Sequence, residues 1–284
     1  MEGNDCYKFS TIRNFIRMTG GRQVRVACDV GANVGAISLL MRTYFPQAKI
    51  FGYEAVEEYY RMACANTSPD PSIKIRRRAV TSAHLFSDDL GAEPRARPAT
   101  LQILKAGPEG GPGWMGGSLV TPCVGSPDAQ AGATPGYRET QEVVLPITLS
   151  EILDEVERET GCSEIDILKL DCEGCEHSTL GCAPVETLRR IRFIVGEYHG
   201  IERFYRVMHG KLYLTHKVNL IGDESLGAFF AERLEGEADG ILKHNKDGML
   251  VSRPWLSSSP IDWHVFNEVY VLPDERAIHA LTLS

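Results

Sequence analysis

The sequence lacks several features that would assign the chain to a special class of protein. Residues 1–18 contain no continuous apolar stretch, so we expect no secretory signal there. No other segment approaches the roughly 18–20 apolar residues needed to span a bilayer. Its 8 cysteines are too few for a disulfide scaffold in 284 residues, so we expect reduced thiols. These absences predict a soluble, cytoplasmic protein without a membrane partner.

The chain also lacks an excess of positive charge. It has 30 Lys and Arg residues against 38 Asp and Glu, which gives a formal net charge of −8. Because nucleic acids are bound mainly through clustered Lys and Arg, we expect no nucleic-acid partner. We interpret the one tight basic run, Arg76–Arg78, as solvated charge at the end of a strand, with contact to an anionic substrate as the alternative. A hydrophobic content of 43% is enough for a sizeable core, so disorder is not the default interpretation.

The first part of the chain contains alternating strand and helix patterns. β-Branched runs predict strands, and apolar residues at helical spacing predict helices between them. We expect strands over 24–29, 49–53 and 73–80, and helices from 34 to Pro46 and over 57–66. This order favours an α/β fold with a parallel, doubly wound sheet, in which ligands bind at the carboxyl ends of the strands.

Further along, the pattern is interrupted and then resumes. Between about residues 85 and 142, Gly, Pro and Ala dominate, which predicts an insertion. We interpret it as a mobile cover over the site, with a plain disordered insertion as the alternative. Thr148 and Glu151 have the spacing of a helix capping box. The remaining predicted elements are strands over 143–147, 165–170, 191–196 and 265–272 and a helix containing Leu226, Phe229, Phe230 and Leu234. We expect a single domain over 1–284, in which the segment after about 200 extends the sheet.

The most informative stretch is Asp29-Val-Gly31-Ala-Asn33-Val-Gly35, which follows the first strand. A dinucleotide-binding loop has the pattern GxGxxG, whose second glycine lets the backbone approach the pyrophosphate. Here Asn33 occupies that second position and Ala36 the third. A side chain at Asn33 hinders a pyrophosphate, but it suits a cofactor with an amino-acid moiety and no phosphates. S-adenosylmethionine is such a cofactor.

Acids end the first two predicted strands. Asp29 can reach the ammonium group of the cofactor directly or through water, while Gly31 and Gly35 permit the tight turn. Glu54 can accept hydrogen bonds from both ribose hydroxyls, but an acid at this distance also serves NAD. A nicotinamide oxidoreductase therefore remains an alternative, and so does a glycine turn with two unrelated acids.

A second polar cluster, Lys169-Leu-Asp171-Cys-Glu173-Gly-Cys-Glu176-His177, follows a predicted buried strand. Asp171 lies where neighbouring strands would point at a bound cofactor. We interpret Glu176 as favourable charge at the start of a helix. Cys172 and Cys175 form a CxxC pair, but no second ligand pair follows at zinc spacing, so we expect buried or free thiols.

The neighbouring strand ends in Glu197-Tyr198-His199, which we expect near Asp171. Methyl transfer is an in-line displacement at a sulfonium, so the protein must align the acceptor oxygen and remove its proton. We assign these tasks to Asp171, Glu173 and His199, with His199 as the general base and a purely structural histidine as the alternative. Asp171 and Glu197 can instead hold Mg²⁺, which we do not favour.

The order of these motifs resembles that of the FkbM family of S-adenosylmethionine-dependent methyltransferases. The resemblance covers roughly residues 24–200 and rests on four stretches: residues 29–35, Tyr53-Glu54, residues 167–176 and Glu197–His199. It implies a Rossmann-like class I methyltransferase fold, with a mostly parallel seven-stranded sheet and helices on both faces. It also implies O-methylation of a small molecule, often a sugar or polyketide-type natural product, and places Ser118 near the cofactor. A non-catalytic, partner-binding subunit with the same fold is the alternative.

Overall fold

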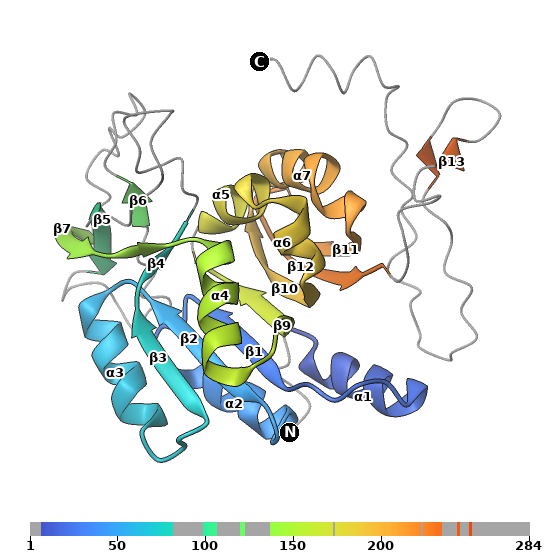
Figure 1. Ribbon diagram of the computed structural model, residues 1–284. Helices are drawn as coiled ribbons and strands as arrows, with labels where there is room; N and C mark the ends of the chain where they lie inside the picture. Colours follow the sequence, from blue (N-terminus) through green and yellow to red (C-terminus); the bar gives the residue numbers. More distant parts are fainter. Residues whose placement is uncertain are drawn as a thin grey trace.

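A seven-stranded sheet forms the centre of the computed structural model (Figure 1). The structure describes residues 7–81, 99–106, 120–122, 137–172, 174–222, 224–234, 243–244 and 250–251. The strands lie in the order β11-β12-β10-β9-β1-β2-β3. Their bounds are β1 Val26–Val30, β2 Lys49–Glu54, β3 Ile73–Arg77, β9 Ile165–Leu170, β10 Ile191–His199, β11 His216–Gly222 and β12 Leu226–Arg233.

Strand directions in this sheet are mostly parallel. Every neighbouring pair from β3 to β10 is parallel, whereas β12 is antiparallel to both β10 and β11. Chain order reverses at β1, where β2 lies on one side and β9 on the other, and ligands of open α/β sheets bind at such a point. The structure thus confirms the Rossmann-like, mostly parallel seven-stranded sheet expected from the sequence.

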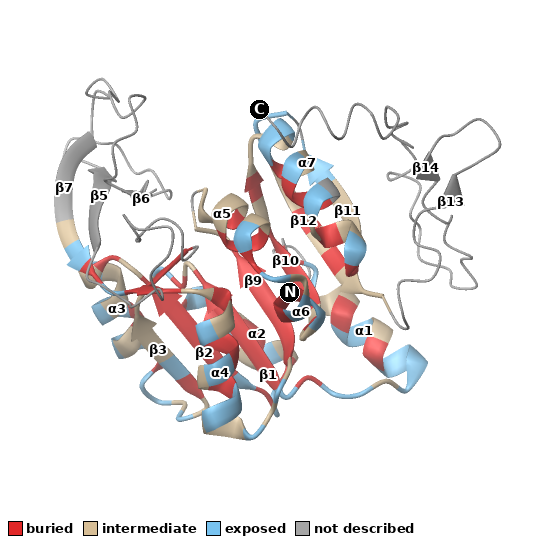
Figure 2. Cartoon of the chain, turned by 45° about the horizontal axis from the view of Figure 1, so that its top comes forward, coloured by how far each residue is buried: buried red, intermediate tan, exposed pale blue. Residues whose placement is uncertain are grey.

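Helices cover both faces of the sheet (Figure 1). On one face lie α1 (Phe9–Thr19), α2 (Ala36–Tyr44) and α3 (Glu57–Thr67), and on the other α4 (Leu149–Thr160), α5 (Cys175–Cys182), α6 (Val185–Arg189) and α7 (Ile201–Gly210). Side chains alternate along each strand, so Val26 and Cys28 pack in the core beneath α4 while Ala27 packs in the core beneath α1 and α2. The central strands are buried along their length (Figure 2).

Several predicted elements are confirmed and two are divided. The capping box of Thr148 and Glu151 opens α4. The strand expected over 73–80 divides at Arg78, because β3 joins the main sheet while β4 (Ala79–Val80) pairs with β8 (Pro146–Ile147). The strand expected over 143–147 divides at Leu145 between β7 (Tyr137–Val144) and β8.

The helix expected around Leu226–Leu234 is wrong. Those residues form β12, in which Phe229 lies opposite Gly196 and Phe230 opposite Val195 of β10. The apolar spacing in this segment fits a helix or a strand, and the backbone hydrogen bonds offered by β10 decide the outcome. The structure therefore extends the sheet after residue 200 with β11 and β12.

The remaining described elements are short. Within the predicted insertion, β5 (Ala99–Ala106), β6 (Val120–Pro122) and β7 form an antiparallel sheet in the order β6-β5-β7. A 3-10 helix covers Leu212–Leu214, and β13 (Lys243–His244) pairs with β14 (Leu250–Val251). The covering role expected of the insertion, and the strand expected over 265–272, lie outside the described residues.

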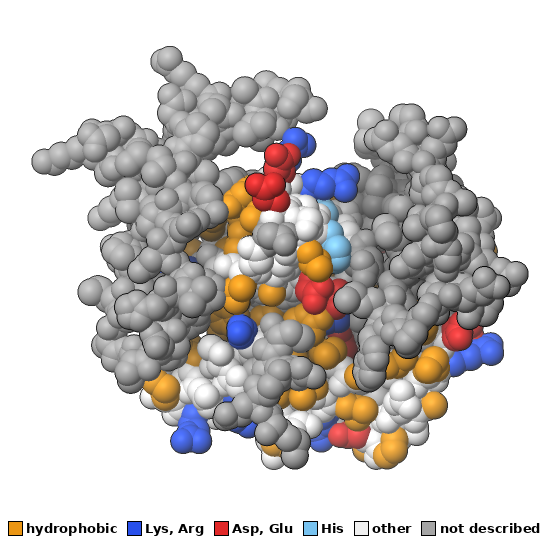
Figure 3. Space-filling model, turned by 180° about the vertical axis from the view of Figure 1, so that it is seen from behind, with side chains coloured by type: hydrophobic (Ala, Val, Ile, Leu, Met, Phe, Trp, Pro, Cys, Tyr) orange, Lys and Arg blue, Asp and Glu red, His pale blue; other side chains and the backbone are white. Residues whose placement is uncertain are grey.

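Two observations concern the surface and the length of the helices. Among the described residues, no helix is both long and apolar enough to pass through a bilayer. On the face seen from behind, the described Lys and Arg side chains are scattered, and several lie beside Asp or Glu (Figure 3). Arg76 itself forms ion pairs with Glu155 and Glu159 of α4.

Candidate active site

The loop between β1 and α2 lies at the carboxyl end of the sheet and has an unusual backbone. Gly31, Asn33 and Gly35 have left-handed φ angles of 73°, 49° and 83°. An ideal Cβ on Gly31 would lie 1.8 Å from the carbonyl oxygen of Asp171, so only glycine fits there. The predicted tight turn is therefore present, and it brings the ends of β1 and β9 together.

Glu54 ties this loop to the end of β2. Its Oε2 accepts a hydrogen bond of 2.7 Å from the backbone N–H of Asn33, and its Oε1 accepts one of 2.9 Å from Val56. Burial raises the pKa of Glu54, and these two hydrogen bonds partly offset that effect. The carboxylate predicted to bind the cofactor ribose thus also fixes the position of the loop.

Lys169 is a buried cation directly beneath the loop. Its Nζ donates to the carbonyl oxygens of Gly31 at 2.9 Å and Val30 at 3.2 Å, and it lies 3.1 Å from Oδ1 of Asp29. The second oxygen of Asp29 accepts a 2.7 Å hydrogen bond from Ser38 in α2. Burial acts to lower the pKa of Lys169, but the nearby carboxylates outweigh it and the pKa is raised. Lys169 and Asp29 therefore form a buried ion pair.

Asp171 is held by the same cation and by a residue from the start of the chain. Lys169 Nζ lies 3.9 Å from Oδ2 of Asp171, and the Tyr7 hydroxyl donates a 2.5 Å hydrogen bond to the same oxygen. The Tyr7 ring also lies under Lys169, with its centroid 5.4 Å from Nζ. Sequence reasoning missed both residues. A lysine in a mostly apolar strand was a signal for Lys169, whereas nothing in the sequence marks Tyr7.

Beyond β9, three side chains gather where β10 ends and α5 begins. His199 Nδ1 lies 2.9 Å from Oε1 of Glu176, and the backbone N–H of His199 donates to the same oxygen at 3.1 Å. His177 Nε2 lies 2.7 Å from the carbonyl oxygen of His199. Glu176 lies in the first turn of α5, as expected of favourable charge at a helix start, but its side chain is fully buried and contacts two histidines.

The expectation of free thiols at Cys172 and Cys175 is also wrong. The two residues are joined by a disulfide across the turn that precedes α5. Gly174 has a left-handed φ of 102°, and the turn brings the two Cα atoms to 5.4 Å, a separation that a disulfide can bridge. Among the described cysteines, the four that are free are Cys28, Cys64, Cys162 and Cys182.

The remaining predicted site residues are Glu173, Ser118 and Glu197. Glu173 and Ser118 lie outside the described residues. Gly196 is paired with Leu170, so Glu197 and Asp171 occupy the next positions on adjacent strands. Within the described ranges, no group of three or more His, Cys, Asp or Glu side chains converges as a metal site would require.

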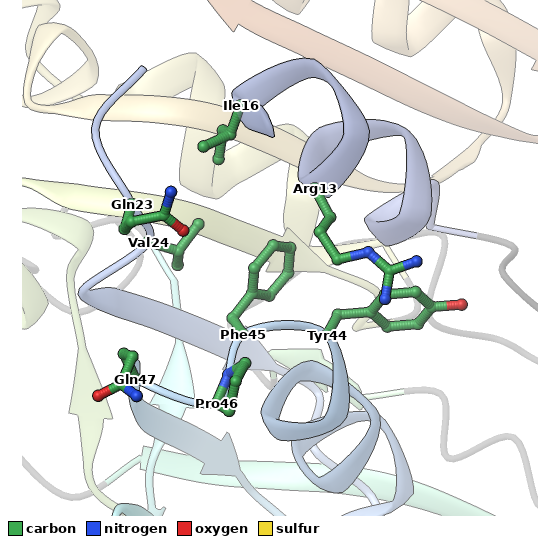
Figure 4. A pocket seen from close by; sticks show the side chains of 8 residues that line it. All are labelled: Arg13, Ile16, Gln23, Val24, Tyr44, Phe45, Pro46 and Gln47. Atoms are coloured by element: carbon green, nitrogen blue, oxygen red, sulfur yellow. The ribbon is translucent and has the colours of Figure 1, made fainter. Parts of the chain in front are cut away.

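A small pocket lies away from this cluster. It is formed by the end of α1, the segment before β1 and the α2–β2 loop, where the strands begin (Figure 4). Arg13 lies over the ring of Tyr44 at 5.0 Å from its centroid, at the pocket wall. Its volume of about 80 Å³ is below the roughly 300 Å³ of small-molecule sites, so it does not compete with the cluster at the other edge.

Comparisons with known proteins give one family and several distant structures. A family model described as the methyltransferase FkbM domain matches residues 29–218, well over half of the chain. No curated protein matches the chain.

The solved structures with similar folds share little sequence with this chain. Precorrin-6y C5,15-methyltransferase from Geobacter metallireducens GS-15 is 10% identical, with a TM-score of 0.39 over 82% of this chain and 94% of that one. Human methyltransferase 10 domain containing protein is 9% identical, with a TM-score of 0.41 over 80% and 82%. The bifunctional kinase-methyltransferase WbdD is 11% identical, with a TM-score of 0.39 over 82% of this chain and only 40% of WbdD.

Proposed function

The chain belongs to the FkbM methyltransferase family, and we propose that it transfers the methyl group of S-adenosylmethionine to a hydroxyl oxygen of a small molecule. The family membership supports methyl transfer. The choice of an oxygen acceptor, and of a sugar or polyketide-type natural product as substrate, extends the proposal beyond the family assignment.

The charge of the site is the observation that carries the proposal. Three carboxylates, those of Asp29, Glu54 and Asp171, lie at neighbouring strand ends around Lys169, the one cation that the described part of the chain places among them. This excess of negative charge repels the two phosphates of a nicotinamide dinucleotide. It attracts S-adenosylmethionine, which carries an ammonium and a sulfonium against one carboxylate. The donors and acceptors therefore fit this cofactor better than a dinucleotide.

Each residue on the cofactor side has a role that follows from its position. The left-handed loop around Asn33 leaves room for an amino-acid moiety, and Glu54 at the end of β2 accepts hydrogen bonds from the ribose. Asp29 supplies negative charge near the ammonium group, while Lys169 keeps that carboxylate in place. When bound, the cofactor supplies an electrophilic methyl group on sulfur.

On the acceptor side, the chain must orient a hydroxyl and remove its proton. His199 is 27% exposed at the end of β10, so its ring can be reached by a substrate. We assign it as the base that would take the hydroxyl proton on Nε2 as the new C–O bond forms and the bond between the methyl group and sulfur breaks. Asp171, with its carboxylate oriented by Tyr7, and Glu173 help to place the acceptor. Mg²⁺ is not required by this arrangement, so a chelator should leave activity unchanged.

Isothermal titration calorimetry tests the proposal most directly. Wild-type protein should bind S-adenosylhomocysteine and should not bind NADH, and Glu54→Gln should weaken the former by about tenfold or more because a charged acceptor for the ribose is lost. Glu186→Gln, an exposed position on α6, should bind like wild type. Binding of NADH without binding of S-adenosylhomocysteine would instead establish a nicotinamide enzyme. Methyl transfer from labelled S-adenosylmethionine to a panel of sugars and polyketides would then identify the acceptor.

A further inference from the structure

Glu176 is a buried carboxylate with an unusual number of hydrogen-bond donors around it. Its Oε1 lies 2.9 Å from His199 Nδ1 and 3.1 Å from the His199 backbone nitrogen, and His177 Nε2 is 3.3 Å away. Its Oε2 accepts a 2.9 Å hydrogen bond from the backbone N–H of Gly174. Glu176 therefore contacts His199 and His177 in addition to carrying negative charge at the start of α5.

The donors keep Glu176 ionised despite its burial. Burial on its own would raise the pKa of Glu176, but the hydrogen bond with His199 and the surrounding donors outweigh it and the pKa is lowered. An ionised carboxylate can only accept hydrogen bonds. The Nδ1 atom of His199 must therefore carry a proton, which leaves the lone pair of the neutral ring on Nε2.

We propose that Glu176 is a positioning residue that fixes the orientation and tautomer of His199, so that Nε2 is the atom that accepts the substrate proton. This inference rests on the proposed function, in which His199 is the base. It identifies Glu176 as the residue that prepares His199 for that role. A negative charge 2.9 Å from Nδ1 also stabilises the imidazolium formed when His199 takes up the hydroxyl proton.

Other charged or titratable groups near His199 also influence the ionisation of its ring. They are His177 on α5, Glu197 on β10, Glu202 in the first turn of α7 and Glu224 before β12, whose backbone carbonyl accepts a hydrogen bond from Ile201. Of the described contacts of His199, the hydrogen bond at Nδ1 goes to Glu176. Removing the charge of Glu176 should therefore change the ionisation of the ring.

Histidine NMR tests this without substrate or cofactor. A long-range ¹H–¹⁵N spectrum of the full-length protein, with the His199 signals assigned from a His199→Gln spectrum, reports which ring nitrogen carries the proton. We expect Nδ1–H for His199 in the wild-type protein at neutral pH. Finding the proton on Nε2 would overturn the proposal, and this measurement needs no variant of Glu176.

Glu176→Gln supplies the second measurement. The amide oxygen can still accept from Nδ1, but the negative charge is gone, so the midpoint of His199 titration should fall by about one pH unit or more. Glu186→Gln on α6 is the matched control and should leave the midpoint unchanged. An unchanged midpoint in a folded Glu176→Gln protein would contradict the proposal.

Kinetics distinguish this inference from the proposed function. With an identified acceptor, Glu176→Gln should lower kcat by about 10–100-fold, while KM for the acceptor stays within about twofold. The pKa reported by the acidic limb of the kcat profile, which is that of the general base, should shift downward. Full activity in Glu176→Gln would overturn the positioning role. Failure of the wild-type protein to bind S-adenosylhomocysteine would overturn the proposed function instead, and would leave the NMR result on Glu176 and His199 unaffected.

Discussion

Lys169 is the residue on which the charge balance of the site depends. It is fully buried, it bonds two carbonyl oxygens at the end of β1, and it stands between the carboxylates of Asp29 and Asp171. A buried ion pair is weak evidence for stability as a whole, but removing one partner leaves an uncompensated charge in the interior. Lys169 therefore links the stability of the fold to the binding of the cofactor.

Lys169→Met should be strongly destabilising. The variant leaves the Asp29 carboxylate buried without a cation, so the free energy of unfolding should fall by about 3–5 kcal/mol in urea denaturation. Binding of S-adenosylhomocysteine should weaken as well, because the β1–α2 loop loses the Nζ donor to Gly31. Adding Asp29→Asn should restore part of the lost stability.

Lys74→Met is the matched control for this prediction. Lys74 forms an ion pair of 2.5 Å with Glu159, but its side chain is 50% exposed. Its loss should lower the free energy of unfolding by less than about 1 kcal/mol. Equal losses in the two variants would show that Lys169 does not act as a buried counter-ion.

At the scale of elements, the β1–α2 loop holds the ends of two strands in contact. Gly31→Ala should disrupt this loop, because the added Cβ would meet the Asp171 carbonyl 1.8 Å away and alanine is strained at a φ of 73°. We expect a loss of more than about 3 kcal/mol in the free energy of unfolding, or no folded protein, with loss of cofactor binding where the fold survives.

Gly20→Ala separates the steric clash expected at position 31 from the backbone strain of an alanine with a left-handed φ. Gly20 ends α1 at a φ of 64°, and nothing lies within 4 Å of an added Cβ. Only backbone strain remains, so the loss should be roughly 1–2 kcal/mol with unchanged binding of S-adenosylhomocysteine. If Gly31→Ala is no worse than Gly20→Ala, close approach of Asp171 is not what requires glycine at position 31.

Elements with strong local patterns could be predicted from the sequence. The Asp29–Gly35 turn, the capping box of Thr148 and the mostly apolar strand before Asp171 each follow from nearby residues, and the structure has all three. β12 could not be predicted in this way, because its apolar residues fit a helix equally well. Its conformation depends on pairing with β10, which is distant in sequence.

The residues that form the site were predictable only in part, because some of them are decided by contacts between elements that are distant in sequence. Sequence reasoning found the strand ends that carry Asp29, Glu54, Asp171 and His199, because parallel strands place their carboxyl ends at one edge. It missed Tyr7 and the roles of Lys169 and Glu176, since these depend on which faces are buried and which side chains meet across elements. The sequence suggested only that Glu176 carries charge at a helix start, whereas in the structure it is buried and lies within hydrogen-bond distance of His199.

For the whole molecule, buried titratable groups predict how stability depends on pH. His216 in β11 is almost fully buried, with Nε2 3.0 Å from the carbonyl oxygen of Ile191 and Nδ1 2.7 Å from the Thr215 hydroxyl. Burial disfavours the charged ring and lowers the pKa of His216 from 6.5 to about 4. The unfolded chain therefore takes up this proton first, and stability is lost as pH falls from about 6.5 to about 4.

His216→Gln should remove this part of the acid sensitivity. A pKa difference of this size corresponds to a loss of roughly 3 kcal/mol in the free energy of unfolding across that range, measurable by urea denaturation at pH 7.5, 6.5, 5.5 and about 4.5. The curve of the variant should be flatter than that of the wild-type protein between these values.

Glu164→Gln is a useful contrast, because Arg233 and Arg22 hold the pKa of Glu164 below its usual 4.5 against the effect of burial. The stability contributed by Glu164 is present above that value and is lost only at lower pH, so its variant should keep the wild-type slope above about pH 5. Parallel curves for wild type and His216→Gln would mean that His216 is not the neutral, buried group that couples acid to unfolding.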